Sequence, residues 1–317
     1  MSVLDEAGRL TATGRQADAV TLVRKSADQG DPEALFAIAN WRLFGLFGPR
    51  DLVEAHRLLD RAAAEGFVEA VRTKATLLAN GTGLAADPAQ SARLLETIRA
   101  WDQHAALQLD FSARMAPVGE FQPSRAETMC EAPLVKRYNG LLTPQECAYL
   151  CGRAEPQLRP SYVTNPATGA QMPHPIRTSM GMSFGPTLED LVVRRINERI
   201  ATATGTEVSC GEPLHILRYT PGQQYKPHTD SMPGEANQRV WTMLIYLNDD
   251  YEGGATRFPR VGLEFRGAAG DALILYNVDG EGRPEPASLH AGLPVTGGVK
   301  WLATRWIRAR PYHPWAV

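Results

Sequence analysis

The chain has 317 residues, of which 44% are hydrophobic and 21% are charged, and its formal net charge is -2. A nearly neutral chain of ordinary composition is a poor candidate for a general binder of nucleic acid or of an anionic membrane surface. Its four cysteines include no Cys-x-x-Cys pair, which indicates reduced thiols rather than a secreted disulfide framework. The N-terminus lacks the basic and apolar regions of a signal peptide, and no apolar run approaches the ~20 residues that span a bilayer. We therefore expect a cytoplasmic protein with no membrane segment.

The first 112 residues carry an internal repeat with a period of 36 residues. The recurring positions are Gly30 and Gly66; Gly45 and Gly81; Ala34, Ala70 and Ala106; Leu22, Leu58 and Leu94; Asp51 and Asp87. Between them, apolar residues recur every three or four positions, which is the pattern of amphipathic helices, and glycine-rich turns separate the segments. A period of this length predicts a stack of helical hairpins over residues 1–112.

These units resemble Sel-like repeats, which are relatives of the tetratricopeptide repeat. The resemblance rests on Ala-Ala-Glu-Gly-x-x-x-Ala at residues 63–70 and on Ala-Asp-Gln-Gly-Asp-Pro-Glu-Ala at residues 27–34, and it weakens in the third unit. Two interpretations remain open: the helices only cover one flank of the following domain, or they form a surface that binds a peptide or protein partner. Residues 113–131 break the helical period with Pro117, Gly119 and Pro123, and we interpret them as a linker.

We assign residues 132–317 to a second domain, which begins with a strand at residues 135–138. Thr143, Pro144 and Glu146 combine an N-cap, a first-turn proline and a capping box, and they predict a helix that runs to about Ala154. A second helix is expected from about residues 187–190 to just before Gly205. The segment between these helices, residues 161–175, is rich in Pro and Gly and is interpreted as a lid.

Short strands separated by Gly, Pro, Asn and Asp follow residue 212. They are expected at residues 214–219, 241–247, 256–259, 272–276 and 300–307. Several short strands of this kind are typical of a sandwich or jelly roll. The predicted fold class is therefore α+β, with an N-terminal α-helical repeat layer followed by a β-core with flanking helices.

The motif His228-x-Asp230 is the candidate metal site. Residues two apart on a strand point to the same face, so this spacing aims an imidazole and a carboxylate at one point. A distant histidine on a neighbouring strand, His290, completes a set of two histidines and one carboxylate. Such a set suits Fe(II), because it leaves coordination positions open for a co-substrate and dioxygen.

The residues around this motif resemble the prolyl 4-hydroxylase branch of the 2-oxoglutarate- and Fe(II)-dependent dioxygenases over about residues 132–310. The matching elements are Tyr219-x-x-Gly222-x-x-Tyr225-x-x-His228-x-Asp230, Gly253-Gly254, Gly270-Asp271, Leu289-His290-Ala291-Gly292 and Lys300. The resemblance implies a double-stranded β-helix (jelly roll) in which His228, Asp230 and His290 bind iron. It also implies that Lys300 pairs with the distal carboxylate of 2-oxoglutarate. Residues 300, 302, 304 and 306 would share the face that points into the barrel.

The resemblance implies further roles for four residues near the motif. Tyr219 and Thr242 match positions that hydrogen-bond the co-substrate, although either could be a hydroxyl of the protein core. Tyr225 would lie beside the iron, and Arg239 would contact the substrate at the mouth of the barrel. His174 and His215 are interpreted as structural.

The expected activity is hydroxylation of a prolyl residue in a peptide or protein, with Fe(II), 2-oxoglutarate and O2, and with release of succinate and CO2. Ascorbate is a candidate reductant. The partner would be a peptide or protein substrate, docked on the repeats in one interpretation, with no nucleic acid and no membrane. The alternatives are a hydroxylase of another side chain or of a free amino acid, and a turnover-deficient module that senses 2-oxoglutarate or oxygen.

Overall fold

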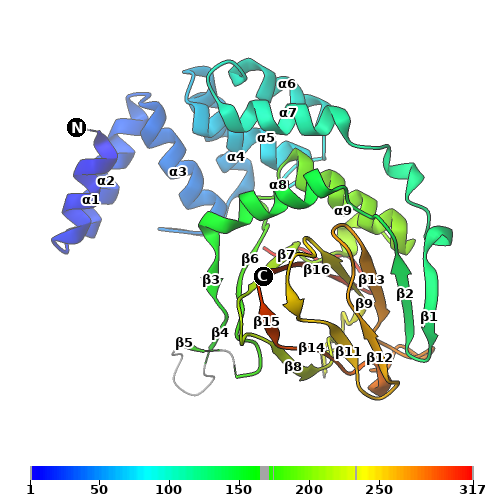
Figure 1. The fold of residues 1–317 in the computed structure, drawn as a ribbon. Coiled ribbons are helices and arrows are strands. Elements are labelled where there is room, and N and C mark those ends of the chain that lie inside the picture. Colours follow the sequence, from blue (N-terminus) through cyan, green and yellow to red (C-terminus); the bar gives the residue numbers. More distant parts are fainter. Residues whose placement is uncertain (1, 165–170, 174, 233, 316–317) are drawn as a thin grey trace. The chain divides into compact units, whose positions relative to one another are not determined.

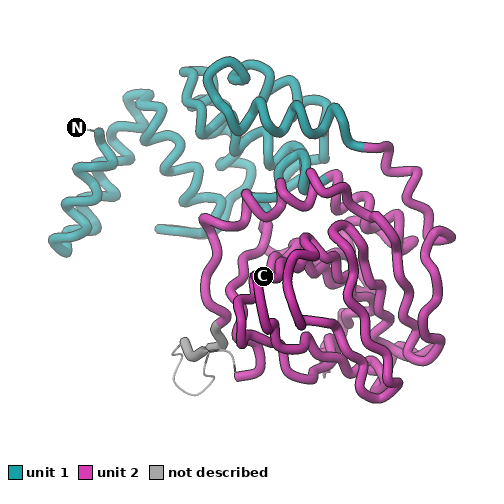
Figure 2. Tube along the Cα trace, viewed as in Figure 1, with its two compact units in different colours: residues 1–115, 186–194 teal, residues 116–185, 195–317 magenta. Residues whose placement is uncertain are grey.

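The structure, a computed structural model, describes residues 2–164, 171–173, 175–232 and 234–315 (Figure 1). The chain forms two compact units (Figure 2). Unit 1 contains residues 1–115 and 186–194, and unit 2 contains residues 116–185 and 195–317. Within the described part of the chain, no helix combines the length and the apolar character that crossing a membrane requires.

Unit 1 is built from helical hairpins, which confirms the predicted repeat. Its helices are α1 (Val3–Ala12), α2 (Gln16–Asp28), α3 (Pro32–Phe44), α4 (Leu52–Ala64), α5 (Val68–Asn80), α6 (Pro88–Ile98) and α7 (Gln103–Arg114). The first helices of the three hairpins, α2, α4 and α6, begin 36 residues apart. The second helices begin 36 and then 35 residues apart, so the third unit departs only slightly from the period.

The repeated polar and glycine residues mark the helix ends of unit 1. Asp51 and Asp87 accept hydrogen bonds from the backbone N–H groups three residues ahead and so cap α4 and α6. Gly45 and Gly81 end α3 and α5 with φ angles of 68° and 80°, a conformation that favours glycine. The period of 36 residues therefore comes from helix boundaries as well as from buried positions.

Residues 186–194 belong to unit 1, although the sequence-based boundaries place them in the second domain. The side-chain amide of Asn80 donates hydrogen bonds to the carbonyls of Pro186 (2.7 Å) and Glu189 (3.1 Å). The side chain of Gln108 accepts a hydrogen bond from the N–H of Leu191. These contacts join positions more than 80 residues apart, and no local sequence pattern predicts them.

The expected linker contains regular structure. Two short 3-10 turns, η1 (Val118–Glu120) and η2 (Pro123–Arg125), precede strand β1 (Glu127–Glu131), which pairs with β2 (Leu134–Tyr138). Four of the five residues of β1 are exposed. This edge strand therefore lacks the alternation of apolar and polar residues that would have predicted it.

Unit 2 contains two main antiparallel sheets. The larger has the strand order β1-β2-β13-β9-β16-β7-β6-β3, and the smaller has the order β12-β11-β14-β8. The new strands are β3 (Arg159–Pro160), β6 (Met180–Ser183), β7 (His215–Tyr219), β8 (Tyr225–His228), β9 (Arg239–Tyr246), β11 (Thr256–Phe258), β12 (Leu263–Phe265), β13 (Ala272–Tyr276), β14 (His290–Gly292) and β16 (Lys300–Arg308). Two short pairs, β10 (Glu252–Gly253) with β15 (Val295–Gly297) and β4 (Tyr162–Thr164) with β5 (Gln171–Pro173), complete the described strands.

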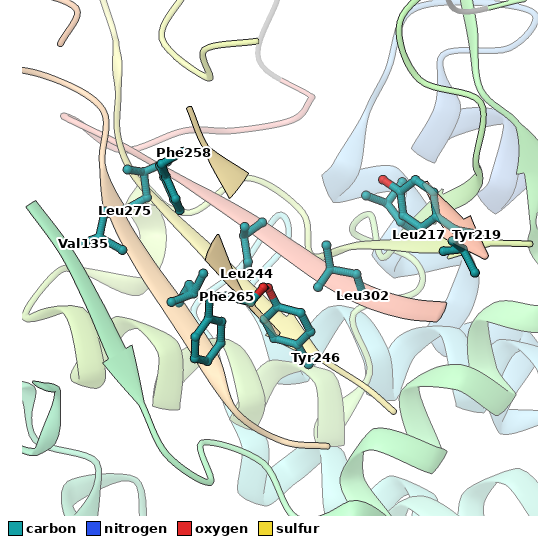
Figure 3. Packing of buried hydrophobic residues seen from close by; sticks show 11 residues of the cluster. Val135, Leu217, Tyr219, Leu244, Tyr246, Phe258, Phe265, Leu275 and Leu302 are labelled. Carbon is teal, nitrogen blue, oxygen red and sulfur yellow. The ribbon is translucent and has the colours of Figure 1, made fainter. Parts of the chain in front are cut away.

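The path of the chain between the sheets is that of a double-stranded β-helix. The chain passes from β7 in the large sheet to β8 in the small one, returns to β9, and crosses again to β11 and β12. It then returns to β13, crosses to β14 and ends with β16 in the large sheet. This topology confirms the predicted jelly roll, and the five strands expected after residue 212 are all present, as is the strand expected at residues 135–138. Side chains from both sheets, including Leu217, Leu244, Phe258 and Leu302, form its core (Figure 3).

Three short 3-10 turns and two helices complete unit 2, and the first residues of the second helix belong to unit 1. They are α8 (Pro144–Ala154), η3 (Glu155–Gln157), α9 (Leu191–Thr204), η4 (Val208–Cys210) and η5 (Pro286–Ser288). Thr143 and Glu146 form the predicted capping box of α8. The Glu146 carboxylate also accepts two hydrogen bonds, of 2.7 and 2.8 Å, from the buried guanidinium of Arg199 on α9. This ion pair connects α8 to the second half of α9.

Candidate active site

The structure brings His228, Asp230 and His290 together. His228 ends β8 and His290 begins β14, and the two residues lie directly opposite each other in the β8–β14 pair. Asp230 lies in a bend two residues beyond His228, so the turn of the chain after β8 directs its carboxylate. The carboxylate oxygens are 3.6 Å from Nε2 of His228 and 3.7 Å from Nε2 of His290. One potential ligand atom from each residue lies within 4.8 Å of the others, so the three residues could hold a metal ion.

Backbone carbonyls orient both imidazoles. Nδ1 of His228 lies 2.9 Å from the carbonyl oxygen of Lys226, and Nδ1 of His290 lies 3.0 Å from that of Ser288. A carbonyl can only accept, so each Nδ1 carries the proton and each Nε2 presents a lone pair to the centre of the triad. Burial and, to a smaller extent, the nearby His290 lower the pKa of His228 to about 4, so the imidazole is neutral at pH 7. A neutral imidazole is the form that binds metals.

The carboxylate of Asp230 is held by a hydroxyl. Burial works against its charge, but interactions with His290 and His228 and a hydrogen bond from Thr242 outweigh it, so the pKa of Asp230 is lowered. Thr242 Oγ1 donates to Asp230 Oδ2 over 2.6 Å and accepts from Asn277 Nδ2 over 2.8 Å. The hydroxyl therefore contacts the carboxylate of Asp230 directly, and the co-substrate contact expected for Thr242 stays a prediction. The fully buried hydroxyl on β9 is occupied by Asp230 and Asn277.

A pocket in the barrel contains the triad and Lys300. Leu217, Tyr219, Leu302, Thr304 and Trp306 are among the residues that line it. The period-two face of β16 therefore points inward, as expected for residues 300, 302, 304 and 306. Tyr219 lies opposite Lys300 in the β7–β16 register, and burial raises the pKa of its phenol.

Lys300 is a buried cation with little local compensation. Its side chain is among the buried groups, and Nζ donates to the carbonyl oxygen of Gly254 over 2.6 Å. The rings of Tyr219, Tyr246 and Tyr251 lie with their centroids 5.2 to 5.9 Å from Nζ. Burial and, to a smaller extent, the charge of Arg266 lower the pKa of Lys300 to about 7. Among the residues that the structure describes, no carboxylate forms an ion pair with this ammonium.

The glycine pair before β11 allows this arrangement. Gly254 has a φ angle of 63°, and a Cβ at this position would come within 3.2 Å of Cδ of Lys300. A side chain here would therefore be strained and would also crowd the lysine. The Gly253-Gly254 motif thus leaves room for Lys300 and presents a carbonyl to it.

Tyr225 and Arg239 lie on different sides of the pocket wall. The Tyr225 ring stacks on His228, with the centroids 3.5 Å apart and an interplanar angle of 15°, and it lines the pocket. Arg239 is bound through two hydrogen bonds, of 2.6 and 2.8 Å, to the carboxylate of Glu212. Its guanidinium lies 4.0 Å from the ring centroid of Trp306, which lines the pocket. Arg239 therefore adjoins the pocket through Trp306, with Glu212 as its counter-ion.

His215 lies apart from the triad, in contact with Ser183. Nδ1 of His215 lies 2.8 Å from the Ser183 hydroxyl, and burial lowers the pKa of this histidine to about 3. This fits the structural interpretation. His174 and residues 165–170 of the predicted lid lie outside the described residues. Sequence patterns missed Glu212 and Asn277 as neighbours of the site, because each is defined by contacts across the barrel.

Comparison with known proteins gives a family match over the residues that carry the site. Residues 214–308 match the 2OG-Fe(II) oxygenase superfamily. Prolyl 4-hydroxylase 1 of Arabidopsis thaliana is 32% identical over 240 residues, which are 70% of this chain and 82% of that protein. Among solved structures, the 2OG complex of a viral collagen prolyl hydroxylase from Paramecium Bursaria Chlorella virus-1 has a TM-score of 0.47 and 27% identity, and covers 57% of this chain and 99% of that one. A Sel1 repeat protein from Oxalobacter formigenes has a TM-score of 0.32 and 22% identity, and covers 34% and 86%.

Proposed function

The chain belongs to the prolyl 4-hydroxylase family of 2-oxoglutarate- and Fe(II)-dependent dioxygenases, and from this premise we propose that it hydroxylates a prolyl residue in a peptide or protein. The observation that carries the proposal is the convergence of His228, Asp230 and His290 in one pocket with Lys300. We assign the activity to residues 132–317, with residues 1–112 as the repeat region and residues 113–131 as the linker.

His228, Asp230 and His290 are the proposed iron ligands. Two imidazoles and one carboxylate fit Fe(II) and leave open positions for exogenous ligands. When bound, Fe(II) with 2-oxoglutarate and dioxygen supplies the oxidation of an unactivated C–H bond, with release of succinate and CO2. The protein orients the two Nε2 atoms through the carbonyls of Lys226 and Ser288 and keeps the centre within an apolar barrel.

Lys300 is the proposed partner of the distal carboxylate of 2-oxoglutarate. A buried ammonium without an ion-pair partner among the described residues is costly, and an anionic ligand would offset that cost. Tyr219 lines the same pocket opposite Lys300 and is proposed to hydrogen-bond the co-substrate. Binding of a dianion would favour the charged form of Lys300 over the neutral one.

Tyr225 and Arg239 are the proposed substrate contacts. Tyr225 stacks its ring on His228 and lines the pocket, so it could limit where a substrate ring lies. Glu212 takes Nε and one terminal nitrogen of Arg239, which leaves the other terminal nitrogen to donate to a peptide carbonyl. The indole Nε1 of Trp306 has no hydrogen-bond partner within the described residues, so it is a second candidate donor.

The repeats are the proposed docking surface for a longer substrate. Helices α1, α2 and α3 of unit 1 form an apolar groove lined by Leu4, Val20, Trp41 and Phe47, among others. Replacing Trp41 by Ala should raise the KM for a protein substrate a few-fold and leave that for a short peptide unchanged. If both KM values stay unchanged, the repeats serve only as a helical layer. The four cysteines, all free thiols, support a cytoplasmic location as part of the proposal.

The deciding experiment offers the protein a library of proline-containing peptides with Fe(II), 2-oxoglutarate and ascorbate. Succinate is measured, and mass spectrometry locates the residue that gains one oxygen atom. Oxygen on proline supports the proposal, whereas oxygen on another residue or on a free amino acid supports the alternative hydroxylases. Absence of succinate with every substrate, while 2-oxoglutarate still binds, would favour a sensing module.

A further inference from the structure

Asn277, Thr242 and Asp230 form a continuous chain of hydrogen bonds behind the triad. Asn277 follows β13 directly, and Thr242 lies on the neighbouring strand β9. The pairing of these strands, together with a backbone bond from Asn277 N–H to the Val240 carbonyl, brings the two side chains together. Both have no exposed surface. Nδ2 of Asn277 lies 2.8 Å from Thr242 Oγ1, which lies 2.6 Å from Asp230 Oδ2.

The chemistry of the three groups gives this chain a single direction. An ionised carboxylate can only accept, so the one hydroxyl proton of Thr242 is donated to Asp230. The hydroxyl oxygen then has only lone pairs to offer on its other side. The contact from Asn277 must therefore be an amide N–H, because the amide oxygen would place two acceptors against each other. Asn277 thus holds the Thr242 hydroxyl with its proton toward Asp230.

The amide of Asn277 is retained in spite of a local cost. Its Oδ1 atom is buried and has no hydrogen-bond partner among the described residues. A buried acceptor without a partner is unfavourable, and an apolar side chain would avoid the cost. The side chain therefore contributes something other than stability, and its one polar contact is with Thr242.

We propose that Asn277 is a positioning residue for the metal centre, which acts through Thr242 on the orientation of the Asp230 carboxylate. The chain engages Oδ2 and holds the carboxylate plane, so that Oδ1 stays directed toward the centre of the triad next to His228. Partners of this kind orient ligands and tune the affinity of a metal site. The inference rests on the proposed function only in taking Asp230 as a ligand.

The test measures the affinity of the full chain for Fe(II) under anaerobic conditions and the visible spectrum of the Co(II)-loaded protein. Thr242→Val and Asn277→Leu should each weaken metal binding by about 10- to 100-fold and shift the Co(II) bands. Thr242→Ser retains the hydroxyl and should stay within a few-fold of the wild type. In a Thr242→Val background, Asn277→Leu should have no further effect, because Asn277 acts only through the hydroxyl.

Ile274→Val is the matched stability control. Ile274 is buried on the same strand, β13, and alternates with the core residues Leu273 and Leu275. The change should lower the Tm and leave metal affinity unaltered. Unchanged affinity and spectra in Thr242→Val and Asn277→Leu would overturn this inference and leave the proposed iron site intact. If the wild type binds no metal, or binds it equally well after His228→Ala, both the inference and the proposed iron site fail.

Discussion

The triad and Lys300 line one pocket, but the protein holds them in opposite ways. Each triad residue is supported from behind: the histidines by backbone carbonyls and Asp230 by Thr242. Lys300 has one carbonyl and three aromatic rings around it, and burial lowers its pKa to about 7. The first region is prepared for a cation without further change. The second holds a cation whose charge is disfavoured until an anion arrives.

This difference separates two kinds of preorganisation. The triad offers neutral nitrogen lone pairs and an ionised carboxylate, so little rearrangement is needed for a metal to bind. Lys300 lies in the same pocket, but its pKa is lowered to about 7, so we expect its charge to depend on an anionic ligand. Metal binding and co-substrate binding should therefore respond differently to mutation and to pH.

The largest expected effect comes from removing the ionised ligand of the triad. Asp230→Ala should lower turnover at least about 10³-fold and abolish tight Fe(II) binding, because two neutral imidazoles alone form a weaker and more open site. Succinate formation and anaerobic metal titration measure the two effects. Glu264→Ala, which removes an exposed carboxylate on β12, is the control and should change neither. Substantial turnover by Asp230→Ala would contradict the assignment of the triad.

Removing the charge at Lys300 should weaken the binding of 2-oxoglutarate rather than that of the metal. Lys300→Met should raise the KM for 2-oxoglutarate by about 10²-fold, since loss of one partner of a buried charge pair costs roughly 2–5 kcal/mol. Metal affinity without co-substrate should remain within a few-fold of the wild type. If Lys300→Met instead loses metal and keeps its affinity for 2-oxoglutarate, the contrast between the two regions is wrong.

The pH dependence of co-substrate binding should reveal the low pKa of Lys300. Above about pH 7 the lysine of the free protein is neutral, so binding a dianion requires uptake of a proton. The Kd for 2-oxoglutarate should therefore rise by up to about tenfold per pH unit between pH 7 and 9. Lys300→Arg, which stays charged, should flatten this dependence. Parallel slopes in the two proteins would show that another group is responsible.

The lowered pKa of Lys300 also predicts how the stability of the protein changes with pH. The folded pKa of about 7 lies below the value of an unfolded lysine, so the unfolded chain binds more protons between these values. Without ligand, the stability of unit 2 should rise as pH increases above 7, and Lys300→Met should remove that rise. Chemical denaturation at several pH values measures it.

Arg239 differs from Lys300, because its charge is already paired with the carboxylate of Glu212. Arg239→Gln should raise the KM for a peptide by about tenfold or less and leave those for 2-oxoglutarate and metal unchanged. Arg283→Gln, which breaks an exposed ion pair with Asp279, is the control. A selective loss of 2-oxoglutarate affinity in Arg239→Gln would assign the co-substrate to this side of the pocket.

Local patterns predicted the parts of the site that depend on local structure. The strand period placed Lys300 on the inward face of β16, and the motif around His228 and Asp230 located the triad. Thr242, Asn277 and Glu212 depend on contacts between strands that lie far apart in the sequence. A buried hydroxyl has the same local pattern whether it faces a co-substrate or a carboxylate. Only the three-dimensional structure separates the two.

The same limit applies to the fold. The helical repeat and the five predicted strands follow from hydrophobic periodicity, and caps such as Thr143 mark helix starts. Strand β1 has an exposed edge position and no such pattern. The inclusion of residues 186–194 in unit 1 depends on the side chain of Asn80, about 106 positions away from Pro186.

The direct pairing of His228 with His290 has a consequence for the cohesion of the small sheet. Strands β8 and β14 have only four and three residues, and the two histidines lie across from each other where the strands meet. A metal bound by both histidines would link the two strands in addition to their few backbone hydrogen bonds. Binding to the folded state alone would add about 2.7 kcal/mol of stability at a metal concentration 100 times the Kd. Heat resistance and protection from proteases would then report how much of the protein in a preparation is loaded with metal.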